Sequence, residues 1–326
     1  MKSISRAAGA ALVLLAGTAF AQAPTGAAYP VKPVRILVGF GIGGGIDISS
    51  RLFAQRLTES LGQPFVVENR PGAGGTVATE MVAKAPPDGY TLIALSVTHA
   101  INATLYSKLP YDTVKSFTPI TPIALQGGVI AVHPSLPVKS LRELIALAKA
   151  NPRDLSYAHA GAGTMMHVGM ELFLSMADIK MLAVPYSGAG PSTVAALGGQ
   201  VPVLSTSLPP SLPHARAGKL RILAVTTAQR TPLAPEYPTV AEAAGLKGYG
   251  AVVWVGFLGP AGTPPAVVNR LNAEVGRLQQ MKEVRDLMAS QGTDPFHDTP
   301  AGFAELIRND IVKWGKVVRE TGIKAD

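Results

Sequence analysis

Short apolar strands, glycine-rich loops and amphipathic helices follow one another repeatedly along this chain. The loops span Gly41–Gly45, Gly72–Gly75, Gly161–Gly163 and Gly188–Gly190, and each lies at or just before the start of a predicted helix. Parallel strands need long crossover connections, which helices usually supply. The alternation therefore predicts an α/β fold with largely parallel sheets.

Apolar runs and helical periodicity locate the individual elements. Ser140, followed three residues later by Glu143, has the pattern of a capping box at the start of one helix. We expect helices at residues 46–62, 76–85, 140–152, 265–280 and 300–321. We expect strands at residues 34–40, 64–69, 90–96, 127–134, 201–207, 220–227 and 250–260.

Two domains are expected from the length and from a restart of the pattern. About 300 residues would remain after export, and domains hold about 150 residues each. The strand–loop–helix scheme begins again after Asn151, and helices follow the strand through Trp254. We therefore predict one domain formed by residues 29–126 together with 253–326, and a second formed by residues 127–252.

Residues 1–23 have the pattern of a secretory signal peptide. Lys2 and Arg6 form a positive n-region, an apolar stretch follows, and Ala21 or Ala23 ends a small-x-small cleavage site. The alternative is an uncleaved membrane anchor, although the apolar stretch is short for spanning a bilayer. We expect cleavage and export.

Charge and cysteine content exclude several classes of site. The formal net charge is +8, and +6 without Lys2 and Arg6, but the basic residues are scattered and form no stripe with interleaved aromatics. Nucleic acid is therefore not an expected partner, whereas a mild positive field favours small anionic ligands. The chain has no cysteine, which excludes disulfides, iron–sulfur clusters and thiol catalysis.

One of the loops has the outline of a dinucleotide-binding turn. Gly39, Gly41 and Gly44 fit G-x-G-x-x-G after a strand, and Glu68 follows 24 residues after Gly44. Four loops are glycine-rich, however, and glycine lets the free N–H groups of a helix start approach an anion closely. The glycines either make tight turns only or together clamp an anion in a cleft. The presence of four loops favours the clamp.

The sequence offers no established catalytic or metal-binding motif. It contains neither G-x-S-x-G nor G-x-x-x-x-G-K-[ST] nor H-E-x-x-H. His99, His159 and His167 all fall near glycine-rich loops, but the eight-residue spacing of the last two is not a zinc spacing. We therefore expect neither a catalytic residue nor a metal.

Six segments between Tyr29 and Ile323 form a distinctive series: YPVKPVRILVGFGIGGGID, GQPFVVENRPGAGGT, APPDGYTLI, LPYDTVKSFTPIT, AGKLRILAVTTAQRTPLAPEYPTVAEA and GPAGTPPAVVNRLNAEV. In their order and spacing they resemble the solute-binding receptors of tripartite tricarboxylate transporters, the Bug-type proteins. The resemblance implies a two-domain α/β periplasmic Venus-flytrap fold, with crossing hinge strands and a carboxylate held between the domains. It implies no cofactor and no catalysis, so the G-x-G-x-x-G match is accidental and NAD is not a ligand.

The same resemblance implies which residues contact the ligand. In the first domain they belong to the loop after the first strand, the second glycine-rich loop and the turn after the third strand. In the second domain they belong to two glycine-rich loops and to one strand end. The implied set is Phe40, Gly41, Ile42, Gly43, Gly44, Asp47, Gly74, Ser96, Thr98, His99, His159, Ala162, Gly163, Thr164, His167, Tyr186, Gly188, Ser205, Thr206 and Ser207.

Three departures from the family pattern bear on the ligand. Gly41-Ile42 stands where Pro-Pro is common, His159 replaces a small residue, and no acidic residue occurs near Ser205–Ser207. Losing an acid removes a partner for an ammonium group, and a histidine adds a ring that can carry a positive charge. Both changes favour a dicarboxylate or an aromatic carboxylate over an amino acid.

We therefore expect a monomeric periplasmic solute-binding protein that captures a small organic carboxylate and delivers it to the membrane subunits of a tripartite tricarboxylate-type transporter. One alternative is a ligand sensor for a signalling partner. A second alternative is an exported enzyme, for which the sequence offers no nucleophile–base pair.

Overall fold

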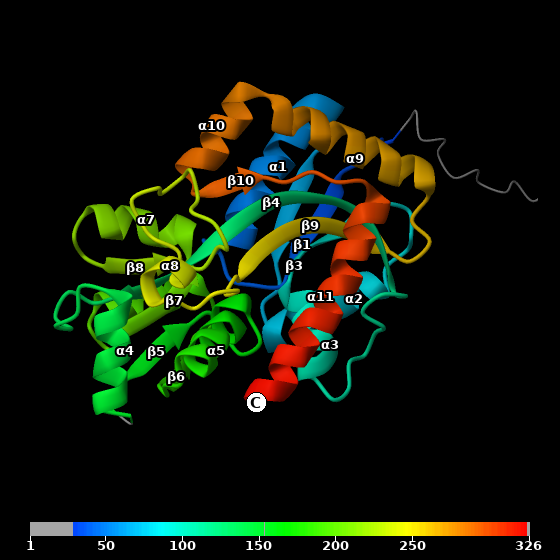
Figure 1. Cartoon of the computed structure of the whole chain (residues 1–326). Helices are drawn as coiled ribbons and strands as arrows, with labels where there is room; N and C mark the ends of the chain where they lie inside the picture. The colour runs from blue at the N-terminus through cyan, green and yellow to red at the C-terminus, as the bar shows by residue number, and fades with distance from the viewer. Residues whose placement is uncertain (1–28, 153, 325–326) are drawn as a thin grey trace, which may run out of the picture.

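The computed structural model describes residues 29–152 and 154–324, so the predicted signal peptide lies outside the described residues. Its strands form two hydrogen-bonded groups that share one long strand, β4 (Phe117–Val132). We call each group, with the helices that pack on it, a lobe. Figure 1 shows the second lobe at the lower left and the first lobe above it and to its right, with β4 and β9 (Val252–Pro260) running between them.

The first lobe is built around the N-terminal part of β4. Its other strands, besides β9, are β1 (Val34–Val38), β2 (Phe65–Asn69), β3 (Thr91–Ser96) and β10 (Thr293–Pro295). Its helices are α1 (Gly45–Leu61), η2 (Ala73–Gly75), α2 (Thr76–Ala83), α3 (Thr98–Leu105), α9 (Pro265–Gln280), α10 (Lys282–Ser290) and α11 (Pro300–Thr321).

The second lobe uses the C-terminal part of β4. Its other strands are β5 (Ser156–His159), β6 (Leu182–Pro185), β7 (Val203–Ser207) and β8 (Arg221–Val225). Its helices are α4 (Leu141–Ala150), α5 (Met165–Ala177), α6 (Ala189–Leu197), α7 (Leu208–Arg216) and α8 (Val240–Ala244).

Parallel pairing is confined to the strand–loop–helix units of each lobe. β1 pairs in parallel with β2 and β3, and β5 pairs in parallel with β6 and β7. Every antiparallel ladder of the described residues contains β4 or β9. The expectation of largely parallel sheets therefore holds within the units, and the strands that connect the lobes make the whole arrangement mixed.

Thr226 joins the two segments through which the chain passes between the lobes. Its hydroxyl group accepts a hydrogen bond from the N–H of Gly128 on β4 (2.9 Å) and donates one to the carbonyl oxygen of Ala251, just before β9 (2.7 Å). Its backbone also bonds to both segments, because its N–H donates to Gly128 and its carbonyl accepts from Ala251. The two crossing segments are thus held together at the point where the lobes meet.

Local sequence signals set several helix ends. α1 ends at Gly62, which adopts a left-handed φ of 73° and donates its N–H to the carbonyl of Thr58. Ser140 caps α4 as predicted by accepting the N–H of Glu143. The carboxylate of Glu143, however, accepts the N–H of Lys139 instead of that of Ser140, so the reciprocal capping box is not formed.

Apolar stripes on the helices bury the core. On α11 the buried side chains are Phe303, Ile307, Trp314 and Val318, whose spacing places them on one face. A smaller cluster under α7 includes Leu208 together with Val129 and Ala131 of β4. None of the helices within residues 29–152 and 154–324 is both long and apolar enough to cross a bilayer.

The loops that follow the parallel strands of the two lobes face one another. A Cβ placed on Gly41 would lie 3.5 Å from the carbonyl oxygen of Ser187, and one placed on Gly74 would lie 3.6 Å from that of Ala162. The lobes are therefore in contact at these loops. Ligands of α/β proteins bind at such carboxyl ends of strands, which places the candidate site here.

Gly39 packs directly against the backbone of the second glycine-rich loop. A Cβ at Gly39 would lie 2.6 Å from the Cα of Gly75, so the two first-lobe loops would have to separate. Gly39→Ala should lower the free energy of unfolding by about 1–3 kcal/mol, as overpacking does. Gly190→Ala is the matched control, because the nearest atom to its Cβ lies 3.9 Å away. Urea titrations of both variants test this, and an equal effect would contradict it.

Candidate functional site

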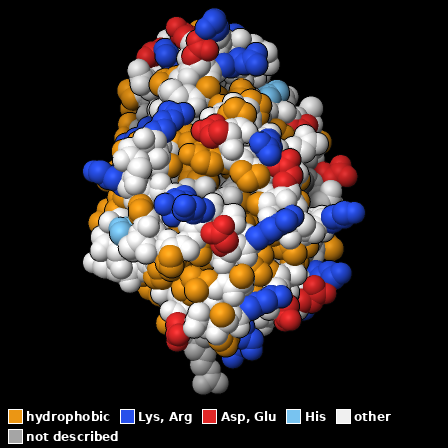
Figure 2. Space-filling model, turned by 60° about the vertical axis from the view of Figure 1, so that its left-hand side comes forward, with side chains coloured by type: hydrophobic (Ala, Val, Ile, Leu, Met, Phe, Trp, Pro, Cys, Tyr) orange, Lys and Arg blue, Asp and Glu red, His pale blue; other side chains and the backbone are white. Residues whose placement is uncertain are grey.

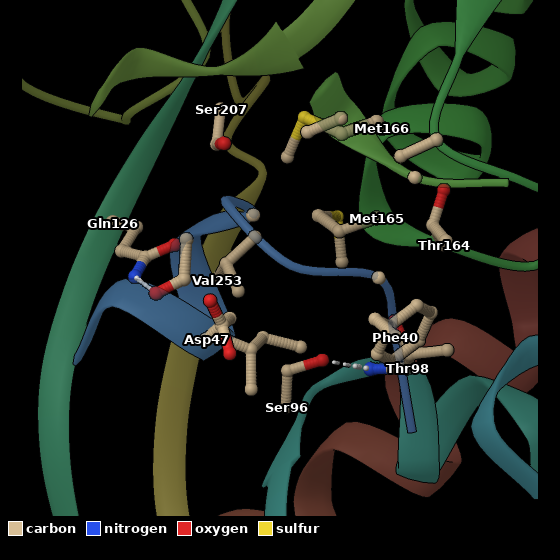
Figure 3. A pocket seen from close by; sticks show the side chains of 17 residues that line it. Phe40, Asp47, Ser96, Thr98, Gln126, Thr164, Met165, Met166, Ser207 and Val253 are labelled. Atoms are coloured by element: carbon tan, nitrogen blue, oxygen red, sulfur yellow. Dashed lines mark hydrogen bonds between the residues drawn. The ribbon is translucent and has the colours of Figure 1, made fainter. Parts of the chain in front are cut away.

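A cavity between the lobes, which we call the inner cavity, has a volume of about 70 Å³. One water needs about 10–15 Å³ by the same measure, so the space admits a small organic group. Figure 3 shows its walls. The lining residues are Phe40, Gly41, Gly44, Gly45, Ile46, Asp47, Ser96, Thr98, Gln126, Ala160, Thr164, Met165, Met166, Gly188, Ala189, Ser207 and Val253.

A second cavity, the outer cavity, adjoins the first. Its volume is about 260 Å³, and it shares Phe40, Ala160 and Thr164 with the inner cavity. Its other walls are the second glycine-rich loop of the first lobe and the loops after β5 and β6. The two cavities together extend between the lobes, so a ligand longer than the inner cavity has room at its Phe40 end.

Helix N-termini from both lobes converge on the inner cavity. The residues that precede or begin α1, α3, α5 and α6 all line it, namely Gly44, Thr98, Thr164 and Gly188. The first N–H groups of a helix have no partner inside that helix, and the helix dipole places positive potential there. No Lys or Arg is among the lining residues. The arrangement can therefore bind an anion through backbone N–H groups, and it needs both lobes to do so completely.

Asp47 lines the cavity but is already fully engaged by the protein. It is 2% exposed. One carboxylate oxygen accepts the N–H of Gly43 (3.0 Å), and the other accepts from Arg51 Nε (3.0 Å) and Asn69 Nδ2 (2.9 Å). These bonds hold the loop between β1 and α1 in place. The charge of Asp47 is balanced by Arg51, so it does not repel an anion as an isolated carboxylate would.

Two polar side chains define the hinge end of the inner cavity. Gln126 on β4 donates from Nε2 to the carbonyl of Gly45 (2.7 Å; Figure 3). It also donates to the hydroxyl of Ser49 (2.9 Å), and the two bonds fix the start of α1 to the hinge strand. The hydroxyl of Ser207 is buried and has no hydrogen-bond partner among the described residues. A buried hydroxyl without a partner is costly, so Ser207 offers a bond to a ligand.

The remaining wall of the inner cavity is apolar. It consists of Phe40, Ile46, Met165, Met166 and Val253. Thioether side chains adapt to irregular shapes and make favourable contacts with rings. The cavity thus combines N–H donors with surface suited to a hydrocarbon chain or a ring.

The structure brings nine of the implied site residues to the inner cavity and others near it. The nine are Phe40, Gly41, Gly44, Asp47, Ser96, Thr98, Thr164, Gly188 and Ser207. Gly74, Ala162 and Tyr186 line the outer cavity. Neither cavity is lined by Ile42, Gly43, His99, His159, Gly163, His167, Ser205 or Thr206. Ile42 is 74% exposed, and Ser205 donates to the carbonyl of Met166. Ligand contacts of all these residues stay predictions.

Sequence reasoning missed eight residues of the inner cavity. Gln126 and Val253 lie on the hinge strands, where no loop motif marks them. The others adjoin residues that the resemblance did imply, and proximity in sequence was the only available signal. They are Gly45, Ile46, Ala160, Met165, Met166 and Ala189.

His159 and His167 form a buried stack beneath the loop that lines the second-lobe wall. Their ring centroids lie 4.3 Å apart, and His159 is 1% exposed. His167 Nδ1 accepts the N–H of Gly163 (3.2 Å), and His159 Nδ1 lies 3.0 Å from the carbonyl oxygen of Gly161. Both rings therefore contact the backbone of the loop before α5 and help to fix its conformation.

Burial keeps these histidines neutral. It lowers the pKa of His167 to about 4, and burial together with the adjacent His167 lowers the pKa of His159 to about 3. Burial also lowers the pKa of His99 to about 4, although its Nε2 bonds to the carbonyl of Thr113 (2.8 Å). Neutral rings cannot supply the positive charge that the sequence analysis considered for His159.

The face drawn in Figure 2 and the described side chains give no indication of a nucleic-acid interface or of a metal site. On the face drawn in Figure 2, basic and acidic side chains are interspersed with apolar ones, and no basic stripe is visible. Within the described residues, no three His, Asp or Glu side chains are grouped so that they could hold a metal ion.

Comparison with known sequences gives consistent matches along the chain. A family model described as the tripartite tricarboxylate transporter family receptor matches residues 49–323. The chain is 36% identical over 318 residues to protein BugT of Bordetella pertussis, and the match covers 97% of each chain. Both matches agree with the resemblance noted from sequence segments.

Solved structures show the same fold. The structure of Rpa4515 from R. palustris with adipate is 37% identical to this chain, with a TM-score of 0.88, and the match covers 91% of this chain and 99% of that one. MatC (Rpa3494) from Rhodopseudomonas palustris with bound malate is 33% identical, with a TM-score of 0.83 and coverage of 89% and 100%. The predicted two-domain α/β binding-protein fold is confirmed.

The buried histidines should make stability depend on pH. Their pKa values are lowered in the folded protein, so below pH ~6.5 the unfolded chain binds more protons and the free energy of unfolding falls as pH falls. Between about pH 7 and about pH 5, each such histidine should cost about 2 kcal/mol. His167→Asn should reduce that loss by about the same amount, measured by urea titration at both pH values. A loss as large as in the wild type would show that His167 is not buried and neutral.

Proposed function

The chain belongs to the tripartite tricarboxylate transporter receptor family, and from that premise we propose that it closes its two lobes around a small organic carboxylate. Members of this family are solute-binding receptors and not enzymes, which sets aside the exported enzyme considered above. Membership also implies work in the periplasm.

The convergence of helix N-termini carries this proposal. Two of the helices belong to the first lobe and two to the second, and no cationic side chain lines the inner cavity. A carboxylate placed there would receive N–H donors from both sides. The ligand would then complete the contact between the lobes, which gives a physical reason for closure to depend on binding.

The walls support a dicarboxylate or an aromatic carboxylate as the ligand. Two structures of similar fold hold adipate and malate, which are dicarboxylates. The wall of Phe40, Met165, Met166 and Val253 suits a hydrocarbon chain or a ring, and the outer cavity offers space beyond Phe40. No free acidic group faces the inner cavity, since Asp47 is paired with Arg51. An amino-acid ligand would lack a partner for its ammonium group.

The biological context forms part of the same proposal. Residues 1–23 serve as a cleaved export signal, and the mature chain is a monomer that delivers its ligand to membrane subunits of a tripartite transporter. The alternative is a receptor that reports ligand to a signalling partner. We place the domain boundaries at residues 29–126 with 253–326 and at 127–252, which agrees with the change of β4 partners between Gly127 and Gly128.

A carboxylate ligand should stabilise the protein against heat. Adipate, malate, benzoate and acetate form a screen that separates dicarboxylates, an aromatic monocarboxylate and a small monocarboxylate. A ligand present at about 100 times its Kd should add about 2.7 kcal/mol to the free energy of unfolding. Thermal-shift measurements with sodium chloride as the ionic control test this. No shift with any carboxylate up to the millimolar range would contradict the proposed ligand class.

Ser207 should contribute to the affinity for the ligand that gives the largest shift. A hydrogen bond to a charged group is worth about 1.5–3 kcal/mol, so Ser207→Ala should weaken binding by about 10- to 100-fold. Isothermal titration calorimetry measures the change. Ser290→Ala on α10 is the matched control, because Ser290 lines neither cavity and should keep wild-type affinity. Equal affinities of the two variants would remove Ser207 from the site.

A further inference from the structure

The two hinge strands have opposite faces that line different cavities. Successive residues of a strand point to opposite sides. Gln126 and Val253, which are paired across β4 and β9, line the inner cavity. Their neighbours Leu125, Val252 and Trp254 line another cavity instead. The hinge strands therefore separate the ligand site from a second space on their other face.

We call this second space the hinge cavity. Its volume is about 450 Å³. The second lobe contributes Ala228, Ala241, Gly248, Tyr249 and Gly250 to its walls. The first lobe and the hinge strands contribute Leu125, Val252, Trp254, Phe296, Leu306, Asp310, Lys313 and Trp314. The space thus lies between the lobes, as the ligand site does, but next to α11, which contributes four of its lining residues.

The lobes meet through their loops on one side of the hinge, whereas on the other side α11 contacts α5 and a cavity separates the rest of the two lobes. On the ligand side, a Cβ on Gly41 would lie 3.5 Å from Ser187 and one on Gly163 would lie 3.3 Å from the side-chain oxygen of Asn102. On the other side the hinge cavity remains. Rotation about β4 and β9 that separates the loops of the ligand site would move the walls of the hinge cavity toward each other.

We propose that the hinge cavity controls the equilibrium between open and closed lobes, so that filling this cavity favours the closed arrangement. The ligand site and the hinge cavity lie on opposite faces of β4 and β9. A rotation about these strands that closes the ligand site therefore widens the hinge cavity. A side chain or molecule that occupies the hinge cavity fits only when the walls are apart. It therefore binds the closed state preferentially and shifts the population toward it.

Ala228 offers a position from which this can be tested without disturbing the core. It is exposed and lines the hinge cavity from the second lobe. Ala228→Phe adds a ring toward the cavity, and Ala241→Phe adds one from α8 as an independent variant. Ala150→Phe is the matched control, because Ala150 is an exposed alanine at the end of α4 that does not line the cavity.

Spin-label distances across the mouth of the ligand site report closure without any ligand. The chain has no native cysteine, so Val77→Cys on α2 and Val194→Cys on α6, both exposed, can be labelled selectively. The filling variants should raise the ratio of short to long distances about three- to tenfold. The measurement is repeated with Gly41→Tyr, because a Cβ at Gly41 already lies 3.5 Å from the carbonyl oxygen of Ser187 and a ring there separates the loops. In that background a rise stays visible even if the wild type is already closed.

Each outcome decides whether filling the hinge cavity favours closure of the lobes. A rise with either filling variant, and none with Ala150→Phe, supports the proposal. Unchanged distances in both backgrounds, or a shift to longer ones, overturn it. Tryptophan emission reports whether the new ring enters, because both tryptophans of the chain line the hinge cavity. The measurement involves no carboxylate, so its failure would leave the proposed ligand untouched.

Discussion

The hydrogen bonds of Thr226 are the interaction on which the two-lobed structure depends. Through its hydroxyl group and its backbone, Thr226 joins Gly128 on β4 to Ala251 just before β9. The first lobe consists of segments on either side of the second in the sequence, so only these two crossings connect the lobes covalently. The crossings are also paired with each other along the β4–β9 ladder, which ends at Gly127 and Val252. They therefore act as a single joint, about which the lobes can turn while the strand pairing within each lobe is kept.

Binding chemistry follows from where that joint places the helices. The inner cavity receives helix starts from both lobes and no cationic side chain, so the positive potential at the site is assembled from backbone groups. Each lobe alone presents half of the donors. Asp47 and Gln126 fix the first-lobe half by holding the loop before α1 and the start of α1 itself. The buried histidine stack plays the corresponding part below the second-lobe loop.

Much of this architecture could be predicted from the sequence, and the exceptions have physical causes. Glycine-rich loops before amphipathic helices marked the α/β units and most of the cavity loops. β4 was expected only from residue 127, because Pro119 and Pro122 argue against a strand; the structure accommodates them at two register shifts in the ladder with β9. α7 escaped prediction because it contains Pro213 and has Pro at its start. Gln126 and the stacked histidines owe their roles to tertiary contacts that no local pattern records.

The position of β9 has a consequence for how the chain acquires its structure. β9 lies between β3 and β4 in the finished sheet, yet it follows them by more than a hundred residues in the sequence. Before β9 is synthesised, β3 can pair with β1 on one edge but has no partner on the other. The N-terminal part of β4 then has neither β9 nor β10 beside it. Unpaired edges of this kind are open to pairing with other chains, and such distant contacts form slowly. The second lobe is made from one continuous segment, so it can complete its sheet before β9 and β10 of the first lobe have been synthesised.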